Sequence, residues 1–274
     1  MTGVCVVVIP SLLLFYDHIY HQHQLVRFVG ARKMATDSSS ESTRKFWNEK
    51  AKGLFEQEWV LRLLEQVRDC LQSNADWLEI RKSSDNEAPV KMIDYACGNG
   101  IVSQALFDFA DVIRGVDISD AMVDQYNELR RQSGIAPERM HAVRGDFLDP
   151  SDNDAIAGPD FHEADAIIMS MALHHCEDPQ AMLSKLVDRL RRNGVLVIID
   201  CLQDSVSDHT GAPSHAHDHY VEDKPDVSYT MSKIGFSASE MKRLFSDAGC
   251  DPETIDLHVY KSHMAQWLKR LAAH

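Results

Sequence analysis

Two glycines and a nearby acid mark the part of the sequence whose residue types could bind a ligand. Gly98 and Gly100 follow a short apolar segment and precede a stretch with helical periodicity. A glycine lets the backbone come close to a ligand, because no Cβ stands in the way. Asp94 ends the apolar segment with a carboxylate beside this turn. Position 103 is a serine, so the third glycine of the dinucleotide fingerprint is missing.

A second acid, Asp117, sharpens this prediction. It ends the next apolar segment and lies roughly twenty residues after Asp94. A carboxylate at this spacing can accept hydrogen bonds from both hydroxyls of a ribose, which is typical of an adenosine site. The alternative is that Asp117 caps the following helix, but Ser119 is itself a good N-cap for that helix.

A third acid, Asp146, follows the third apolar segment in the sequence Gly145-Asp146-Phe147. Its carboxylate could accept a hydrogen bond from an adenine amine, while Phe147 or Ile118 packs on the ring. The alternative is that Asp146 caps a turn.

The elements that must position these residues form a regular alternation from residue 90 onward. Short apolar segments are separated by segments of helical periodicity, and the apolar segments are 90–95, 112–116, 140–143, 166–169 and 195–199. This is the βαβ pattern of an α/β fold with a mostly parallel, twisted sheet and helices on both faces. The carboxyl ends of parallel strands meet at one edge, so we expect the glycines and acids to share a crevice.

The chain divides into four expected parts. Residues 41–85 show apolar side chains at three- and four-residue steps, which predicts an N-terminal helical extension that caps the sheet. The sheet domain follows at 86–262, and 263–274 are expected to form a C-terminal helix. Residues 1–40 are expected to be a poorly structured or targeting-like extension, since the apolar run near the start is too short to span a bilayer.

Four motifs, met in order along the chain, resemble those of class I S-adenosylmethionine-dependent methyltransferases, in particular the group that acts in ubiquinone and menaquinone pathways. They lie at 94–100, 117–119, 145–147 and 165–175. The resemblance covers about residues 40 to 260. It implies a Rossmann-like sheet, S-adenosyl-L-methionine as cofactor, and transfer of a methyl group to a small-molecule acceptor by in-line displacement.

The resemblance also implies that the motif residues surround the cofactor. The expected cofactor-binding residues are Asp94, Ala96, Gly98, Gly100, Asp117, Ile118, Asp146, Phe147 and Met169. Among them, Asp94 would hold the methionine amine, often through water, while Asp117 would take the ribose and Asp146 the adenine amine. Met169 would end the fourth strand beside the sulfonium.

His174 and His175 are the candidate catalytic residues, because they follow the fourth strand near the ligand-binding edge. One of them could act as a general base or orient the acceptor. The alternative is that one packs against the sheet and the other holds the loop through a backbone hydrogen bond.

The aromatic residues Phe46, Trp47 and Phe55 also have two interpretations. They could close over the cofactor, where a cation–π contact would suit the sulfonium. Ordinary helix packing would place them in the same part of the chain.

Composition and residue spacing disfavour several classes of partner and cofactor. The formal net charge of -14 disfavours a nucleic-acid substrate and docking on anionic membranes. A second histidine group, His209, His215, His217 and His219, lacks the spacing of a metal site, so no metal is expected. The scattered cysteines suit a reducing compartment, which favours the cytoplasm, or the mitochondrion if the extension is a transit peptide.

Three rival functions stay open. The chain could bind the cofactor without catalysis, as a regulatory module, or it could methylate a basic protein. A nicotinamide dehydrogenase would share Asp117, but the third glycine and a Tyr-x-x-x-Lys pair are lacking. The first rival is motivated by the C-terminus: 254–261 read as a sixth strand, and no seventh strand is evident to complete the antiparallel hairpin that the family normally has.

Overall fold

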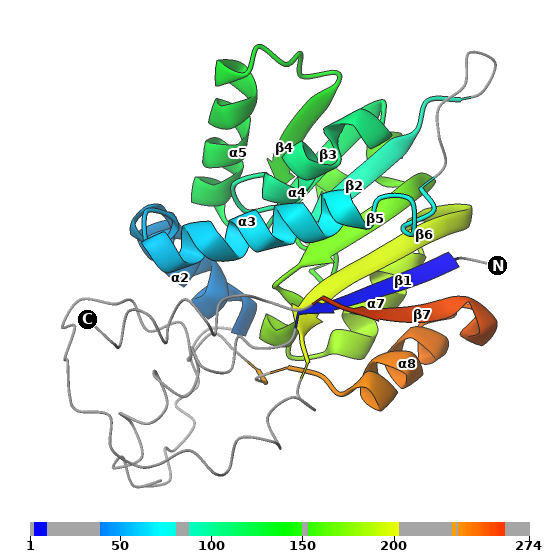
Figure 1. The fold of residues 1–274 in the computed structure, drawn as a ribbon. Helices are drawn as coiled ribbons and strands as arrows, with labels where there is room; N and C mark the ends of the chain where they lie inside the picture. Colours follow the sequence, from blue (N-terminus) through cyan, green and yellow to red (C-terminus); the bar gives the residue numbers. More distant parts are fainter. Residues whose placement is uncertain are drawn as a thin grey trace, which may run out of the picture.

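The computed structural model describes residues 3–9, 39–80, 88–149, 153–202, 232–233 and 235–260. Their strands form one sheet in the order β4-β3-β2-β5-β6-β1-β7 (Figure 1). All of its neighbouring strands pair in parallel. The strands are β1 Gly3–Ile9, β2 Lys91–Tyr95, β3 Val112–Asp117, β4 Met140–Arg144, β5 Ala164–Ser170, β6 Leu190–Cys201 and β7 Ile255–Val259.

Helices cover both faces of this sheet. They are α2 Ser39–Phe55, α3 Glu58–Ser73, α4 Ile101–Ala105, α5 Asp120–Gln132, α6 Asn153–Ile156, α7 Pro179–Val187 and α8 Ala238–Asp247, with a 3-10 turn η4 at Leu173–His175. Each predicted strand and the two-helix extension are therefore confirmed, as is the α/β class with a parallel sheet. Among the described residues, no helix is long and apolar enough to cross a membrane.

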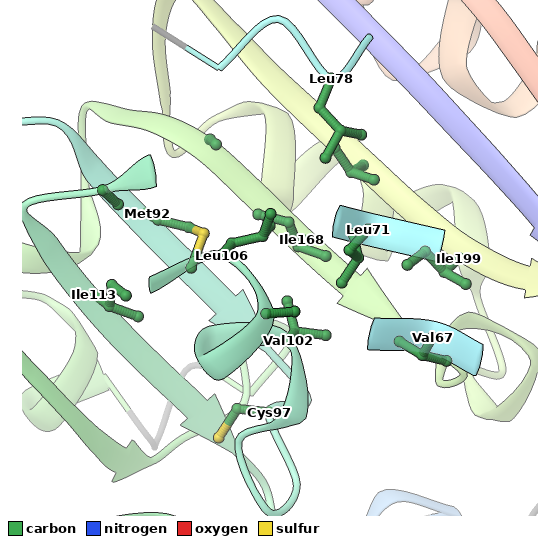
Figure 2. Close-up of a cluster of buried hydrophobic side chains, with 14 of the residues drawn as sticks. Val67, Leu71, Leu78, Met92, Cys97, Val102, Leu106, Ile113, Ile168 and Ile199 are labelled. Atoms are coloured by element: carbon green, nitrogen blue, oxygen red, sulfur yellow. The ribbon is translucent and has the colours of Figure 1, made fainter. Parts of the chain in front are cut away.

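The core has two halves because successive strand residues point to opposite faces. On one face, Val67 and Leu71 of α3 belong to the same buried cluster as Met92 of β2 and Val102 of α4 (Figure 2). On the other face, α7 and α8 pack against alternate residues of the same strands, such as Ile93. Burial on both sides explains why the central strands read as continuous apolar runs.

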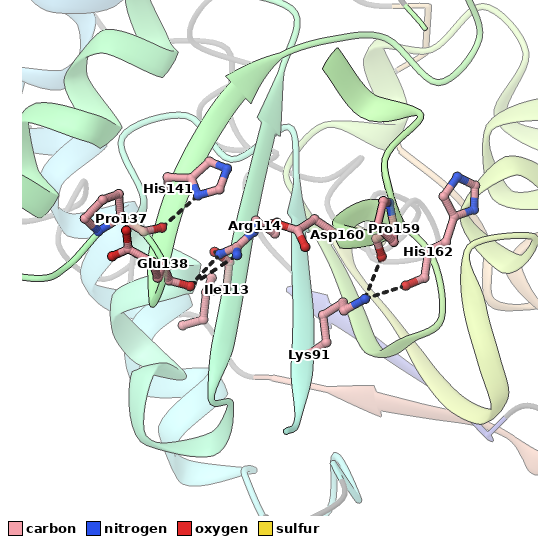
Figure 3. Close-up of polar contacts among 9 residues, drawn as sticks. All are labelled: Lys91, Ile113, Arg114, Pro137, Glu138, His141, Pro159, Asp160 and His162. Atoms are coloured by element: carbon pink, nitrogen blue, oxygen red, sulfur yellow. Dashed lines mark hydrogen bonds and ion pairs between the residues drawn. The ribbon is translucent and has the colours of Figure 1, made fainter. Parts of the chain in front are cut away.

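Polar contacts hold the amino end of β2 and tie β3 to the neighbouring loops (Figure 3). Lys91 Nζ donates to the carbonyls of Pro159 and His162 at 2.7 and 2.9 Å. Buried Arg114 pairs with Asp160 at 2.7 Å and donates to the Glu138 carbonyl. These contacts satisfy backbone carbonyls of the loops and anchor β2 and β3 at this end.

The structure corrects the expectations for the chain ends. Gly3–Ile9 form strand β1, so the expectation of a poorly structured segment is wrong for these residues. Strand β1 lies between β6 and β7 and is parallel to both, which fills the place of the missing seventh strand. The sixth predicted strand is confirmed as β7, and it pairs in parallel with β1 instead of in the antiparallel hairpin that the family normally has. Residues 10–38 and the expected helix at 263–274 lie outside the described residues.

Candidate cofactor and acceptor site

A cavity of about 610 Å³ lies at the carboxyl ends of β2, β3 and β5. The sheet side of its wall includes Ala96, Gly98, Asp117, Ile118, Asp146 and Met169. The opposite side comes from α2 and α3, with Trp47, Phe55 and Trp59 among its residues. The cavity is thus the crevice that the parallel topology predicted, covered by the helical extension.

The turn after β2 has the backbone form that its glycines suggested. The φ angles of Ala96, Gly98 and Gly100 are all positive, at 55°, 50° and 87°. Gly98 lies in the cavity wall, whereas Gly100 does not. At Gly100 a Cβ would lie 3.0 Å from the Tyr126 ring, so this glycine serves the close packing of the turn on α5.

Asp117 anchors this turn and faces the cavity. Its Oδ2 accepts from the Gly98 amide and its Oδ1 from the Ser119 amide, each at 2.9 Å. Burial raises its pKa to about 6, and the backbone hydrogen bonds oppose this rise. A carboxylate offers about four lone-pair sites, so its oxygens keep acceptor capacity for hydroxyl donors in the cavity. Ser119 caps α5 at Met122, as the sequence suggested, so Asp117 is not the cap residue.

Asp94 does not line the cavity. Its Oδ2 accepts from the Ser103 amide at 3.1 Å and from the Ser103 hydroxyl at 2.7 Å, and Tyr126 donates to the same hydroxyl. Burial raises the pKa of Asp94 to about 7, and the two Ser103 hydrogen bonds oppose the rise. The carboxyl therefore holds the first turn of α4 in place, and the sequence analysis did not foresee this partner.

Of the residues expected to bind adenine, Asp146 lies in the cavity wall and Phe147 lies in the core. Asp146 lines the cavity and accepts from the Tyr95 hydroxyl at 3.2 Å and the Leu148 amide at 2.9 Å. Phe147 does not line it, because its ring stacks on Tyr95 at 4.6 Å and lies 3.7 Å from the Arg189 guanidinium carbon. Of the two residues expected to pack on the adenine ring, only Ile118 lies in the wall.

Both candidate histidines line the cavity after β5. His174 is 3% exposed, and its Nδ1 lies 2.7 Å from Oδ1 of Asp200, at the end of β6. The His175 ring meets Trp47 of α2 edge-on, with centroids 6.1 Å apart. Asp200 was missed by the sequence analysis, because no motif marks an acid at the end of this strand.

Asn99 is a second residue that sequence reasoning missed. Its Oδ1 is buried and has no hydrogen-bond partner among the described residues. The side chain lies in the cavity wall between the two glycines of the turn. An unpaired buried acceptor is costly unless a ligand donates to it, so Asn99 is a candidate partner for an ammonium group.

The aromatic residues of α2 are divided between the cavity wall and the packing of the helix. Trp47 and Phe55 line the cavity, with ring centroids 6.4 Å apart. Phe46 does not line it and is 2% exposed, in contact with Trp47. The histidine group at 209–219 lies outside the described residues.

Comparison with known proteins agrees with this geometry. Residues 59–255 match the model of a family described as a methyltransferase domain, which is more than half of the chain. An uncharacterized methyltransferase of Schizosaccharomyces pombe is 38% identical over 42% of this chain and 39% of its own length. The ubiquinone biosynthesis O-methyltransferase of Pasteurella multocida is 24% identical over 39% of this chain and 44% of its own length. The chain thus matches about two-fifths of the length of these relatives.

A solved structure shows the same fold. The magnesium protoporphyrin IX methyltransferase of Synechocystis PCC 6803, with bound SAM, superposes with a TM-score of 0.51 at 16% identity. The match covers 79% of this chain and 88% of that protein. Since the family model spans most of the sheet and its strand-end turns, this chain belongs to the methyltransferase domain family.

Proposed function

We propose that the protein transfers a methyl group from S-adenosylmethionine to a small-molecule acceptor. The observation that carries this proposal is the cavity at the strand ends, where Gly98, Asn99 and Asp117 meet. The Synechocystis relative binds S-adenosylmethionine on the same fold, which supports the choice of cofactor. Bound there, the cofactor supplies an electrophilic methyl group on a positively charged sulfur, which takes the bonding pair when the methyl group leaves.

The residues of the cavity fit the donors of that cofactor. The unpaired Oδ1 of Asn99 would accept from the methionine ammonium, and Asp117 would accept from the ribose hydroxyls. Asp146 and Ile118 would hold the adenine. Asp94 would not contact the cofactor and would act indirectly, because its carboxyl orders the turn after β2 through Ser103.

The protein's own contribution to the reaction is alignment and exclusion of water. Trp47 and Phe55 of the helical cap close one side of the cavity, and Met169, next to the end of β5, lies on the other. Holding the acceptor in line with the methyl group can supply several kcal/mol of the barrier reduction. The helical cap must move to exchange ligands, because it covers the cavity.

The charge of the wall limits the acceptor. Among the described residues, its carboxylates are Asp117, Asp146, Asp149, Glu177 and Asp178, and its only basic side chains are the two histidines, with no Lys or Arg. A phosphate or carboxylate on the acceptor would find no cationic partner there. The acceptor we propose is therefore a neutral or cationic small molecule, whereas nothing in the wall selects a nucleic acid.

The decisive experiment is calorimetry with S-adenosylhomocysteine, followed by a screen for label transfer. The full chain should bind S-adenosylhomocysteine, and Asp117→Ala should weaken this binding at least about tenfold, from loss of hydrogen bonds to a charged group. Labelled cofactor should then methylate a component of a metabolite extract. Binding without any transfer would favour the regulatory module, and binding of NAD in its place would favour the dehydrogenase.

The cytoplasm is the compartment that we propose. Five cysteines, Cys70, Cys97, Cys176, Cys201 and Cys250, are free thiols, and all of them except Cys176 are buried. Burial raises the pKa of the Cys70 and Cys176 thiols to about 12, so they stay protonated and inert. Free, unreactive thiols are typical of proteins in a reducing compartment.

A further inference from the structure

The contact between His174 and Asp200 links the ends of two neighbouring strands. Asp200 lies one residue before the end of β6 and is 2% exposed, while His174 lies in η4 just after β5. The carboxylate accepts from the His174 backbone amide at 3.1 Å through Oδ2. Its Oδ1 lies 2.7 Å from His174 Nδ1 and 2.7 Å from the Cys201 amide. Asp200 thus holds both the main chain and the ring of one histidine.

The other ring nitrogen of His174 is free. Nε2 has no hydrogen-bond partner among the described residues, although the ring is almost fully buried. His174 belongs to the cavity wall. Asp200 accepts and cannot donate when ionised, so Nδ1 must carry the proton and Nε2 must hold the free lone pair.

We propose that Asp200 is a positioning residue, which holds His174 in the tautomer whose Nε2 takes a proton from the acceptor in the cavity. The proposal rests on the proposed function and extends it to the class of acceptor. That acceptor has a hydroxyl or thiol at the reacting atom, because such a group must lose its proton as it is methylated.

The proton balance is simple. The O–H or S–H bond of the acceptor breaks, its electron pair stays on the acceptor, and the proton goes to Nε2. A lone pair of the acceptor forms the new bond to the methyl group. The imidazolium that results lies beside the Asp200 carboxylate, which stabilises its positive charge. The proton then leaves to solvent when the product does.

A metal site is the rival interpretation of the same residues. His174, Asp200 and Cys201 place potential ligand atoms within 4.8 Å of one another. However, Nδ1 and Oδ1 are at hydrogen-bond distance, and the amides of His174 and Cys201 occupy the carboxylate as well. Burial also raises the pKa of the Cys201 thiol well above its usual range, which disfavours the thiolate that a metal would need.

The tautomer can be measured without knowing the acceptor. Nitrogen-15 histidine labelling of the full chain, at a pH above the ordinary histidine pKa of about 6.5, distinguishes protonated from free ring nitrogens. The His174 signals are those that His174→Gln removes. We expect a protonated Nδ1 and a free Nε2, and we expect Asp200→Asn to reverse them, because an amide can donate to Nδ1.

Chemical modification gives a second measurement that does not depend on folding of the His174 variant. Diethyl pyrocarbonate reacts with a free imidazole nitrogen, and peptide mass spectrometry locates the product. The rate at His174 should fall at least about tenfold in Asp200→Asn, the change expected when a hydrogen bond to a charged group is lost. The control is Asp165→Asn, which removes an equally buried carboxylate at the opposite end of β5 and should leave this rate unchanged.

The outcomes separate this proposal from the one on which it rests. An unchanged tautomer and an unchanged modification rate in Asp200→Asn would overturn the positioning role, even if S-adenosylhomocysteine binds normally. Stoichiometric zinc in the dialysed protein, lost in Cys201→Ser, would also overturn it in favour of the metal site. Failure of S-adenosylhomocysteine to bind would instead reject the proposed function.

Discussion

Asp94 and Asp117 lie near the carboxyl ends of neighbouring strands, but their side chains have different hydrogen-bond partners. Asp94, one residue before the end of β2, turns its carboxyl to Ser103, while Asp117 ends β3 and lies in the cavity wall. Burial raises the pKa of both, to about 7 and about 6. Their difference in role comes from the partners that each side chain meets.

Binding of S-adenosylhomocysteine should depend on pH through Asp117. Its ionised form accepts hydroxyl donors at both oxygens, and its protonated form loses acceptor capacity. Affinity should therefore rise as the pH increases through about 6 and level off above that value. Calorimetry over this range should show the rise in the full chain and a flat, weaker profile in Asp117→Asn. The exposed Asp124→Asn on α5 is the matched control, and a rise of equal size in Asp117→Asn would contradict the assignment.

Asp94 should make the free energy of unfolding depend on pH. Its pKa is raised in the folded protein, so the folded state holds a proton that the unfolded chain releases above its ordinary value of 3.8. Its stabilising contribution is fully present below that value and is lost as the pH rises to about 7, by up to about 1.4 kcal/mol per pH unit.

Urea denaturation of Asp94→Asn tests this sign. The amide stays neutral, so the free energy of unfolding of the variant should rise relative to that of the parent protein as the pH increases from about 3.8 to about 7. Asp108→Asn changes a nearby exposed acid, so the pH profile of its free energy of unfolding should be parallel to that of the parent protein. Parallel curves for Asp94→Asn as well would show that its carboxyl ionises without cost in the folded state.

The sequence predicted which strand ends approach the ligand but not where each side chain points. Strand order follows from the βαβ alternation, so Asp117, Asp146 and Met169 could be placed at one edge. The turning of Asp94 toward Ser103, and of Phe147 into the core, depends on packing between elements distant in the chain. The His174–Asp200 contact is of this kind, and no spacing rule reveals it.

At the scale of elements, the site depends on how tightly the turn after β2 packs on α5. Gly100 is the N-cap of α4 and has a φ of 87°. The Tyr126 ring lies where a Cβ would extend. The same tyrosine donates to Ser103, which holds Asp94, so the turn, α4 and α5 are joined through one ring.

Gly100→Ala should cost more stability than a left-handed backbone alone explains. Gly134→Ala is the control, because Gly134 has a φ of 67° and nothing within 4 Å of its added Cβ. Both variants carry the strain of an L-residue in this region, about 1–2 kcal/mol. Gly100→Ala adds overpacking against Tyr126, for a further ~1–3 kcal/mol. Equal denaturation midpoints for the two variants would show that the Tyr126 ring moves away from the added methyl group without a cost in stability.

The helical extension could be predicted because its apolar periodicity is strong. Its place over the cavity was one of two alternatives that the sequence left open, and the contact of Trp47 with His175 forms only in the folded chain. Asn48 of α2 accepts from the Ser119 hydroxyl at 2.8 Å and so fixes the helix against the start of α5. Such a contact between side chains far apart in sequence leaves no local pattern.

At the scale of the whole molecule, the sheet is completed by the first strand of the chain. β1 separates β6 from β7 and pairs with both. Its sequence is a short apolar run followed by Pro10, which matches a leader segment as well as a buried strand. The position of its two partners, near the other end of the chain, explains why the sequence analysis missed it.

A chain that begins at Met34 should therefore lose β7 as a protected strand. Without β1, the edge of β6 is unpaired and β7 has no parallel neighbour. We expect a lower denaturation midpoint and fast hydrogen exchange at amides 255–259, while amides 140–144 of β4, at the opposite edge, keep their protection. Equal protection of 255–259 in both chains would show that β7 does not need β1.

The place of β1 also sets an order for assembly on the ribosome. β1 leaves the exit tunnel before both of its partners, because β6 and β7 follow it in the sequence. Until β6 and β7 emerge, this apolar run has no strand to pair with and is open to capture by chaperones or by another nascent chain. This side of the sheet therefore forms only after both β6 and β7 have been translated.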